Sequence, residues 1–464
     1  MMTCTSFTGS PGRLVAWGAF VAHLVNVSLV SGQTDAYVAL MSNDTLINAD
    51  IWDEEPKIFT ANYAFEGIQG VEGTTKEAIE AAGGTWIDNV PEACSTIVNP
   101  VRTTAQTPSG VANLFGYPTY YADAMPIVFS WPVKVSTVGP GDFQLTLNTG
   151  EVVYPEVASI APNLEWNERS TVVVFGEFGN RISPDKPGAV YVEKVEIVDD
   201  GTPLMLVGTG GKLFNAVGLS YNASCCIPYG PGAKGPTLVA AKLSYFSDEG
   251  EYTAADGGAA QYPNSCSDLY GEEVQYRLRM YTSGGFSPDG VSPLLPDSYE
   301  DFFRVHVSVG EGKTMTLDKV GEDYVVPGAG SLKVLGLADL GVLKASGYDA
   351  CWFSDADNYI DVCMVGSEAA ARRIVALEIP SSEAGNTTSE SAYQPLYNPG
   401  GPGTNPAQGV NYTSPSPYTY QTVRIALDDT MTVTVYDTMG GDQSWASRCV
   451  TTTMTGLLLL LSVL

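Results

Sequence analysis

The residues best suited to chemistry are three aspartates in a short segment between Cys351 and Cys363. Asp355, Asp357 and Asp361 stand at positions one, three and seven of a run that resembles the start of a calcium loop. Hard cations such as calcium are bound in proteins by several oxygen ligands at this kind of spacing. The segment is therefore the one candidate metal site of the chain.

Two positions of a calcium loop are missing from this segment. Ile360 stands at position six, where such loops have glycine, and Gly366 stands at position twelve, where they have glutamate. A polar hairpin between two disulfide-bonded strands is the alternative, and we favour it. Calcium is the one cofactor for which the sequence offers a candidate site.

Nothing in the sequence marks an active site. His306 is the only histidine outside the first 32 residues, and it lies in a strand-like run with no marked nucleophile beside it, so we expect a half-buried structural histidine. A zinc site of the usual kind is not expected, because no Cys-x-x-Cys occurs. Carboxylate-pair catalysis needs only two acids, but no pair is marked. We therefore expect no enzymatic activity.

Both ends of the chain have the pattern of processing signals. Residues 1–32 contain one charge and an apolar stretch followed by small residues, which is typical of a cleaved secretory signal peptide. Residues 443–464 end in an apolar tail that is typical of a glycosylphosphatidylinositol anchor signal, although a single-pass anchor or a proteolytically removed tail is also compatible. Each alternative predicts an extracellular protein, either secreted or attached to a membrane at the cell surface.

The cysteines and sequons agree with this location. Six of the eight cysteines lie between the two expected signals, which fits three disulfides with 15 possible connectivities. The spacing favours a local pair of Cys351 with Cys363 and leaves the partners of the other four open: Cys94, Cys225, Cys226 and Cys266. Four N-glycosylation sequons begin at Asn43, Asn222, Asn386 and Asn411.

The chain is strongly acidic. Its formal charge is −29, and removal of the two signals, which contain Arg13 and Arg448 and no acids, takes this to −31. Such a surface excludes nucleic acid as a partner and leaves cations, basic proteins and mineral surfaces. Since hydrophobic residues make up 44% of the chain and no acidic run exceeds three residues, the sequence predicts a folded acidic protein.

The hydrophobic pattern is mainly β. Apolar and polar residues alternate in runs rich in β-branched and aromatic residues, separated by Gly, Pro, Asn or Asp, which predicts an antiparallel, β-sandwich-like architecture with long loops. Helical patterns are few and short, the best being 76–82 and 367–375. The expected strands cover residues 126–135, 143–147, 171–175, 189–197, 237–245, 302–309, 423–427 and 431–436.

The sequence divides into five parts. The signal peptide at 1–32 precedes a β-rich extracellular region at 33–380. A Pro/Gly/Ser-rich loop or linker at 381–418, a terminal β segment at 419–442 and the C-terminal signal at 443–464 complete the chain. The terminal β segment is expected to return and complete a sheet.

Two segments, 161–181 and 275–296, resemble the folded part of the acidic, aspartate-rich proteins of the stony-coral skeletal organic matrix. The resemblance covers much of the chain between the signals, but it contains no catalytic signature. It implies secretion by a calcifying tissue, binding of calcium or carbonate mineral, and association with other matrix proteins. The long aspartate runs of that family are absent here, which puts direct mineral templating in doubt.

The resulting expectation is a non-enzymatic, secreted acidic glycoprotein of a mineralising extracellular matrix. Two alternatives remain open from the sequence. One is a lipid-anchored receptor or adhesion protein of the cell surface. The other is a metal-uptake protein that uses some of the 25 tyrosines and scattered aspartates as oxygen ligands.

Overall fold

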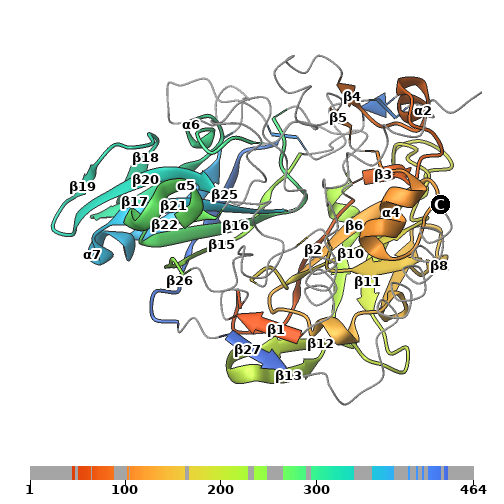
Figure 1. The fold of residues 1–464 in the computed structure, drawn as a ribbon, viewed down its shortest axis with the longest axis horizontal. Coiled ribbons are helices and arrows are strands. Elements are labelled where there is room, and N and C mark those ends of the chain that lie inside the picture. The colour runs from red at the N-terminus through yellow and green to blue at the C-terminus, as the bar shows by residue number, and fades with distance from the viewer. Residues whose placement is uncertain are drawn as a thin grey trace, which may run out of the picture.

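Two β-sandwiches, built from consecutive halves of the chain, make up the fold (Figure 1). The computed structural model describes residues 44–47, 51–63, 65–87, 102–103, 105–161, 163, 167–227, 235–247, 265–288, 294–338, 358–380, 396–397, 404–405, 410–411, 416–429 and 433–436. The expected mainly β, antiparallel architecture with few short helices is confirmed.

The N-terminal sandwich packs a five-stranded sheet against a four-stranded sheet. The first sheet has the order β2 (Ile58–Ala61), β6 (Ala122–Phe129), β10 (Thr171–Gly176) and β9 (Val157–Ser159), with β3 (Phe65–Gln69) also paired to β6. The second sheet has the order β14 (Ser220–Asn222), β11 (Val192–Ile197), β7 (Phe143–Leu147) and β8 (Val152–Val153).

Smaller elements complete this half of the chain. They are the hairpin of β12 (Met205–Gly208) and β13 (Lys212–Asn215), the pair of β4 (Trp86–Ile87) and β5 (Arg102–Thr103), and the helices α2 (Lys76–Ala81) and α4 (Pro108–Phe115). Both helices begin as their sequences require, since the hydroxyls of Thr75 and Thr107 accept hydrogen bonds from backbone N–H groups of the first turn. Helix α2 matches the predicted helix at 76–82.

The C-terminal sandwich packs a six-stranded sheet against a four-stranded sheet. The six-stranded sheet has the order β19 (Tyr324–Val326), β20 (Gly330–Ala338), β21 (Tyr359–Gly366), β16 (Tyr276–Thr282), β15 (Leu238–Tyr245) and β26 (Arg424–Ile425). The four-stranded sheet has the order β18 (Lys313–Leu317), β17 (Arg304–Gly310), β22 (Ile374–Ile379) and β25 (Thr419–Thr422).

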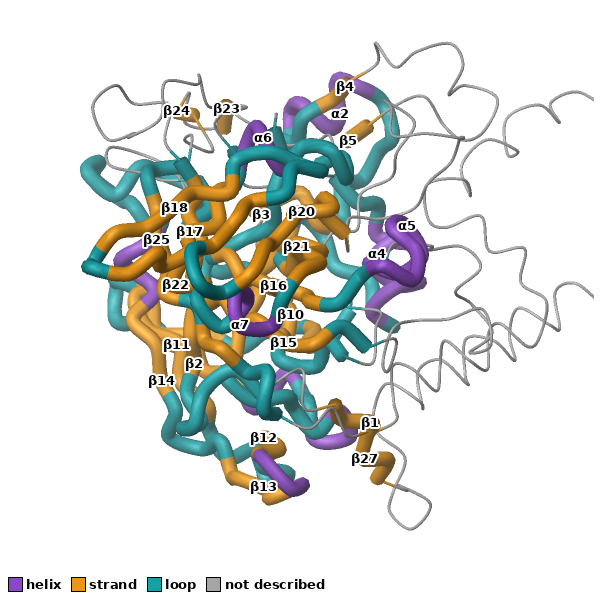
Figure 2. The backbone as a smooth tube through the Cα atoms, turned by 90° about the vertical axis from the view of Figure 1, so that its left-hand side faces the viewer, coloured by secondary structure: helices purple, strands orange, loops and turns teal. Residues whose placement is uncertain are grey.

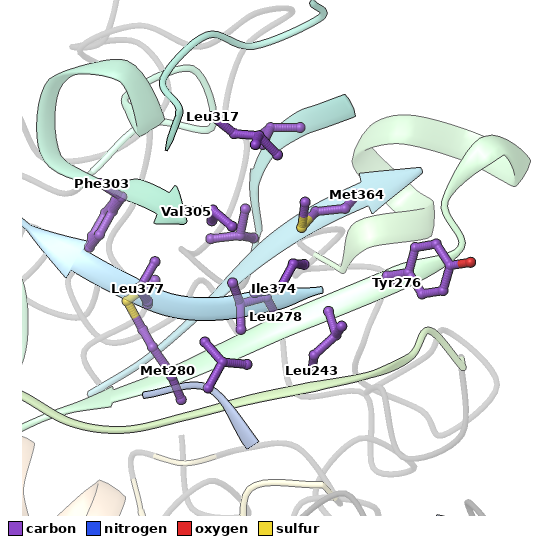
Figure 3. Close-up of a cluster of buried hydrophobic side chains, with 14 of the residues drawn as sticks. Leu243, Tyr276, Leu278, Met280, Phe303, Val305, Leu317, Met364, Ile374 and Leu377 are labelled. Atoms are coloured by element: carbon purple, nitrogen blue, oxygen red, sulfur yellow. The ribbon is translucent and has the colours of Figure 1, made fainter. Parts of the chain in front are cut away.

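The core of this second sandwich shows why the strands pair as they do. Leu278 and Met280 of one sheet meet Val305 and Leu377 of the other, and all four side chains are fully buried (Figure 3). Alternate residues of each strand thus face the core, as the period of a β-strand requires. Two short helices pack against this core, α6 (Tyr299–Phe302) and α7 (Glu368–Ala371), and a third, α5 (Cys266–Tyr270), packs against Cys363 of β21. The helix predicted at 367–375 is shorter, because β22 begins at Ile374.

The predicted terminal β segment does return to complete sheets. Strand β25 pairs with β22, and β26 adds to β15 as the single parallel pairing between named strands of the described chain. Two further pairs join β1 (Asp44–Ile47) to β27 (Val433–Tyr436) and β23 (Thr404–Asn405) to β24 (Val410–Asn411), as Figure 2 shows. The predicted loop at 381–418 is not solvated throughout, since Leu396 is fully buried in the C-terminal core.

One expected disulfide is wrong. Cys363 on β21 is bonded to Cys266, the first residue of α5, and the two Cα atoms are 5.7 Å apart. A cysteine forms one disulfide, so Cys351 is not its partner. The spacing of Cys351 and Cys363 favoured a local hairpin, whereas α5 packs over the face of β21 on which Cys363 lies. Cys351 and Cys94 lie outside the described residues, as do the side chains of Cys225 and Cys226.

This disulfide should matter for stability, because it spans 97 residues. We expect Cys266→Ser to lower the free energy of unfolding by about 3–5 kcal/mol, since a bridge over a loop of this length restricts the unfolded chain strongly. Urea denaturation measures the loss. Cys351→Ser is the control for the pairing: peptide mapping should find the bond between Cys266 and Cys363 intact in it, and a free Cys363 thiol in that variant would contradict the assignment.

Candidate functional site

Asp361, one of the three predicted calcium ligands, is part of a buried ion pair. It lies directly opposite Arg279 in the register of β21 and β16. The guanidinium of Arg279 donates through Nε to Oδ1 at 2.7 Å and through Nη2 to Oδ2 at 2.9 Å. Arg277 Nε lies 3.7 Å from Oδ2 of the same carboxylate. Two positive side chains therefore occupy the carboxylate, and the prediction of Asp361 as a calcium ligand is wrong.

The other two predicted ligands, Asp355 and Asp357, lie outside the described residues. Their role in calcium binding stays a prediction. Among the side chains that the structure does describe, no three His, Cys, Asp or Glu groups come together in a way that could hold a metal ion.

The ion pair extends across the junction of the two sandwiches. Nη1 of Arg279 donates to the backbone oxygen and to Oδ1 of Asn167, at 3.1 and 3.0 Å, and lies 4.0 Å from Glu168. Its guanidinium also lies over the ring of Tyr359, 5.3 Å from the centroid. Residues 167–168 belong to the N-terminal half, so one buried arginine connects both halves of the protein.

Aromatic side chains surround this network. Trp52 of the N-terminal half stacks on Tyr281, with ring centroids 4.1 Å apart, and Tyr281 packs edge-on against Tyr359 at 4.2 Å. Lys242 on β15 lies over Trp52 and donates to the backbone oxygen of Ile51. The junction is thus a buried arrangement of charges and rings, suited to holding two domains together.

A second buried cluster, which the sequence did not indicate, lies in the N-terminal sandwich. Glu66 on β3 and Asp123 on β6 are both buried, and the guanidinium of Arg181 packs beside them against Gly67. Gly67 has φ +68°, and a Cβ there would lie 2.4 Å from Arg181 Nη1, so only glycine fits. Asp123 accepts hydrogen bonds from the backbone N–H groups of Gly67 and Phe178.

Burial changes the protonation of both acids. It raises the pKa of Asp123 to about 7, although the two backbone N–H groups and Arg181 oppose the shift. Burial, followed by the nearby charge of Asp123, raises the pKa of Glu66 well above its usual range. Neither carboxyl oxygen of Glu66 has a hydrogen-bond partner among the described residues. The contacts of this cluster hold β3, β6 and the loop after β10 together.

Asp142 is a third buried acid. Its carboxylate accepts hydrogen bonds from the backbone N–H groups of Gly139 and Leu204, and so holds two loops of the N-terminal sandwich together. Burial raises its pKa to about 7, and the negative charges of Asp200 and Asp199 add to the shift against those two hydrogen bonds.

His306 lies in a strand, as the sequence predicts, but it is buried and not half-buried. It is buried on β17, where Nε2 contacts Glu378 of β22 at 2.5 Å and Nδ1 lies 3.2 Å from the hydroxyl of Thr316 on β18. The ring also packs against Tyr420 of β25, 5.4 Å away. These contacts join all four strands of one sheet.

The sequons are only partly described. Asn222 is exposed at the end of β14, and its Oδ1 accepts hydrogen bonds from the backbone and the hydroxyl of Ser224, the third residue of the sequon. Asn411 lies on β24, and its side chain is outside the described part. Asn43 and Asn386 are outside it as well.

Most carboxylates of the described chain lie outside the cores. Six acids of the described residues are buried: Glu66, Asp123, Asp142, Glu168, Asp361 and Glu378. In five places, two consecutive exposed acids stand together, next to the ends of secondary-structure elements. These acid pairs are Glu54–Glu55, Asp199–Asp200, Glu272–Glu273, Glu322–Asp323 and Asp428–Asp429.

No helix of the described residues is long and apolar enough to cross a membrane. The chain matches no family model, no curated protein and no solved structure. Its function therefore has to be argued from its own residues.

The buried ion pair provides one test of this description. We expect Arg279→Met to destabilise the protein by about 3–5 kcal/mol, because it leaves the buried carboxylate of Asp361 without its main partner. The double variant Arg279→Met/Asp361→Leu should recover much of that loss in urea denaturation. Asp428→Asn, which removes the charge of the exposed partner of Arg372, is the control and should cost far less, because water and salt screen an exposed pair. Equal losses for Arg279→Met and Asp428→Asn would contradict the buried pair.

The raised pKa values of the buried acids predict how the stability of the protein depends on pH. A carboxyl group whose pKa is higher in the folded than in the unfolded protein stabilises the fold at low pH, and this contribution is lost as the pH rises towards the folded value. We therefore expect Asp123 and Asp142 to make the free energy of unfolding fall between about pH 4 and pH 7. Denaturant titrations across this range measure the slope. In Asp123→Asn the slope should be smaller, and an unchanged slope would contradict the role of Asp123.

Proposed function

We propose that this protein is a non-enzymatic, secreted acidic glycoprotein of a mineralising extracellular matrix, which binds calcium ions and carbonate mineral through dispersed surface carboxylates. The observation that carries the proposal is the placement of the five acid pairs. Each pair is exposed and lies at a bend or end of an element whose neighbours are fixed in a sandwich. Asp428 and Asp429 are held in ion pairs with Arg372 and Arg424, and the other four pairs carry the carboxylates that both domains present at their surfaces.

Basic residues do little to neutralise this surface. The chain has 23 Lys and Arg against 52 Asp and Glu. Several of these cations are already engaged by acids within the fold, for example Lys319 with Glu300 and Arg372 with Glu368. Exposed carboxylates attract divalent cations, and the attraction of many weak sites adds up on a surface with many charges. It is also screened by salt over a distance of about 10 Å at 0.1 M.

The resemblance to coral skeletal matrix proteins supports the proposed matrix role through the two sandwich cores. The segment 161–181 contains β10, and the segment 275–296 contains β16, each an inner strand of one sandwich. Both strands are buried along their whole length. The resemblance therefore concerns the cores, while the acid pairs lie at the surface, where long aspartate runs are absent and weak, distributed binding takes their place.

Adsorption to calcium carbonate tests the proposal. A variant with four pairs neutralised (Glu54, Glu55, Asp199, Asp200, Glu272, Glu273, Glu322 and Asp323 to the corresponding amides) takes the formal charge of the processed chain from −31 to −23. We expect it to adsorb severalfold less, because fewer carboxylates face the mineral, and we expect adsorption of the native protein to fall as sodium chloride rises. Depletion of protein from solution measures both.

The matched control exchanges Asp and Glu at the same eight positions and keeps the charge. It should adsorb as the native protein does. Equal adsorption of the neutralised and the charge-preserving variants, or adsorption that is insensitive to salt, would overturn the proposal.

A further inference from the structure

Tyrosine dominates the exposed large hydrophobic side chains of the described chain. Seven of the eleven are tyrosine, and the other four are Val or Leu. Three of the seven lie within five residues of each other, directly after α4: Tyr117, Tyr120 and Tyr121, which are 50%, 54% and 45% exposed. We call residues 117–121 the tyrosine loop. Single exposed apolar residues are ordinary, but three aromatic rings in one short loop are a concentrated feature.

The backbone of the tyrosine loop is fixed. Helix α4 ends in the left-handed Gly116, which turns the chain away from the helix axis. The hydroxyl of Thr119 donates to the backbone oxygen of Gln69, and the N–H of Tyr121 donates to the oxygen of Gly70. A Cβ at Gly70 would lie 1.8 Å from the oxygen of Thr119, so the loop sits directly on β3. The three tyrosines are therefore about half exposed on an anchored backbone.

Three of the four other exposed tyrosines of the described chain have contacts of their own. Tyr154 donates a hydrogen bond to Gln144, Tyr245 packs against Tyr276, and Tyr420 packs against His306. By contrast, the three rings of the tyrosine loop have no hydrogen bond through the phenol and no ring contact with the residues around them that the structure describes. Their phenol groups are open to a reagent from solution.

We propose that the tyrosine loop is an oxidative cross-linking site, at which a phenol of one copy of this chain is joined to a phenol of a second copy as dityrosine. The oxidant class is hydrogen peroxide used by a haem peroxidase. One peroxide takes one electron and one proton from each of two phenols and is reduced to two waters. The two phenoxyl radicals form a carbon–carbon bond ortho to their oxygens, and the hydrogen on each coupled ortho carbon then moves to the carbonyl oxygen of its own ring, which restores two phenols.

The charge of the protein controls when this reaction occurs. Two copies with a formal charge near −31 repel each other, and the repulsion falls when cations screen or bind the carboxylates. Calcium therefore promotes contact between tyrosine loops of neighbouring copies. The effect of calcium rests on the proposed function, which places the protein in an extracellular matrix rich in calcium. The exposure of the phenols does not depend on the proposed function.

The test uses the processed full-length protein with horseradish peroxidase and hydrogen peroxide, with and without calcium chloride. Dityrosine fluorescence, denaturing gels and mass spectrometry of cross-linked peptides report the product. We expect covalent dimers joined through residues 117–121, severalfold more of them with calcium, and severalfold fewer in the variant Tyr117→Phe/Tyr120→Phe/Tyr121→Phe. Because phenylalanine keeps the ring, circular dichroism should show this variant folded.

The matched control is Tyr154→Phe/Tyr245→Phe/Tyr420→Phe, which removes three exposed phenols that have contacts and should dimerise as the native protein does. Dimers joined through other tyrosines, equal dimerisation of the two variants, or dityrosine only within monomers would overturn the cross-linking site. Mineral adsorption of the loop variant should be unchanged. Loss of cross-linking with normal adsorption, or the reverse, therefore separates this inference from the proposed function.

Discussion

The hydrogen bonds that Arg279 makes in the interior hold the two sandwiches of this protein together. Its guanidinium contacts Asp361 on its own sheet and Asn167 on the other domain, and Tyr359 covers one face of it. A buried charge of this kind is costly unless it is fully satisfied, so the junction has little freedom to open or slide. Trp52 against Tyr281 and Lys242 on the backbone of Ile51 add to this contact, so the two sandwiches are joined at several points around Arg279.

The same arrangement separates two uses of carboxylates in one molecule. A few acids are buried, and each has a structural task, such as closing the strands around Asp123 or satisfying Arg279. The other acids of the described chain are exposed or partly exposed, and ten of them stand in the five acid pairs. Only the surface acids are accessible to cations. The number of acids in the sequence is therefore larger than the number that can bind them.

Much of the fold could be predicted from the sequence, because the strands follow simple rules. The run 143–147 alternates apolar and polar residues and forms β7 with the same bounds, and the valine-rich run 171–175 forms the buried strand β10. The division into two sandwiches was not predicted, because both halves have the same strand pattern and no composition shift marks the junction. Local spacing gives no information on which distant strand lies opposite.

That limit explains the errors at the candidate site. Asp361 and Cys363 looked like parts of a local hairpin, yet their partners, Arg279 and Cys266, are remote in the sequence. The sequence did contain a pattern that indicates a buried ion pair between these strands. Asp361 stands in the apolar run Tyr-Ile-Asp-Val-Cys-Met, and Arg277 and Arg279 alternate with apolar residues, a pattern that is typical of buried charges facing each other across strands.

The pairing of β1 with β27 has a mechanical consequence. In this antiparallel ladder Asp44 lies opposite Tyr436, so the outer ends of the first and last described strands leave the body at the same point. A force that pulls these two ends apart loads the hydrogen bonds one after another, as in opening a zipper, and not all together as in shearing. This pair yields first under tension, and the two sandwich cores bear load only after it has opened.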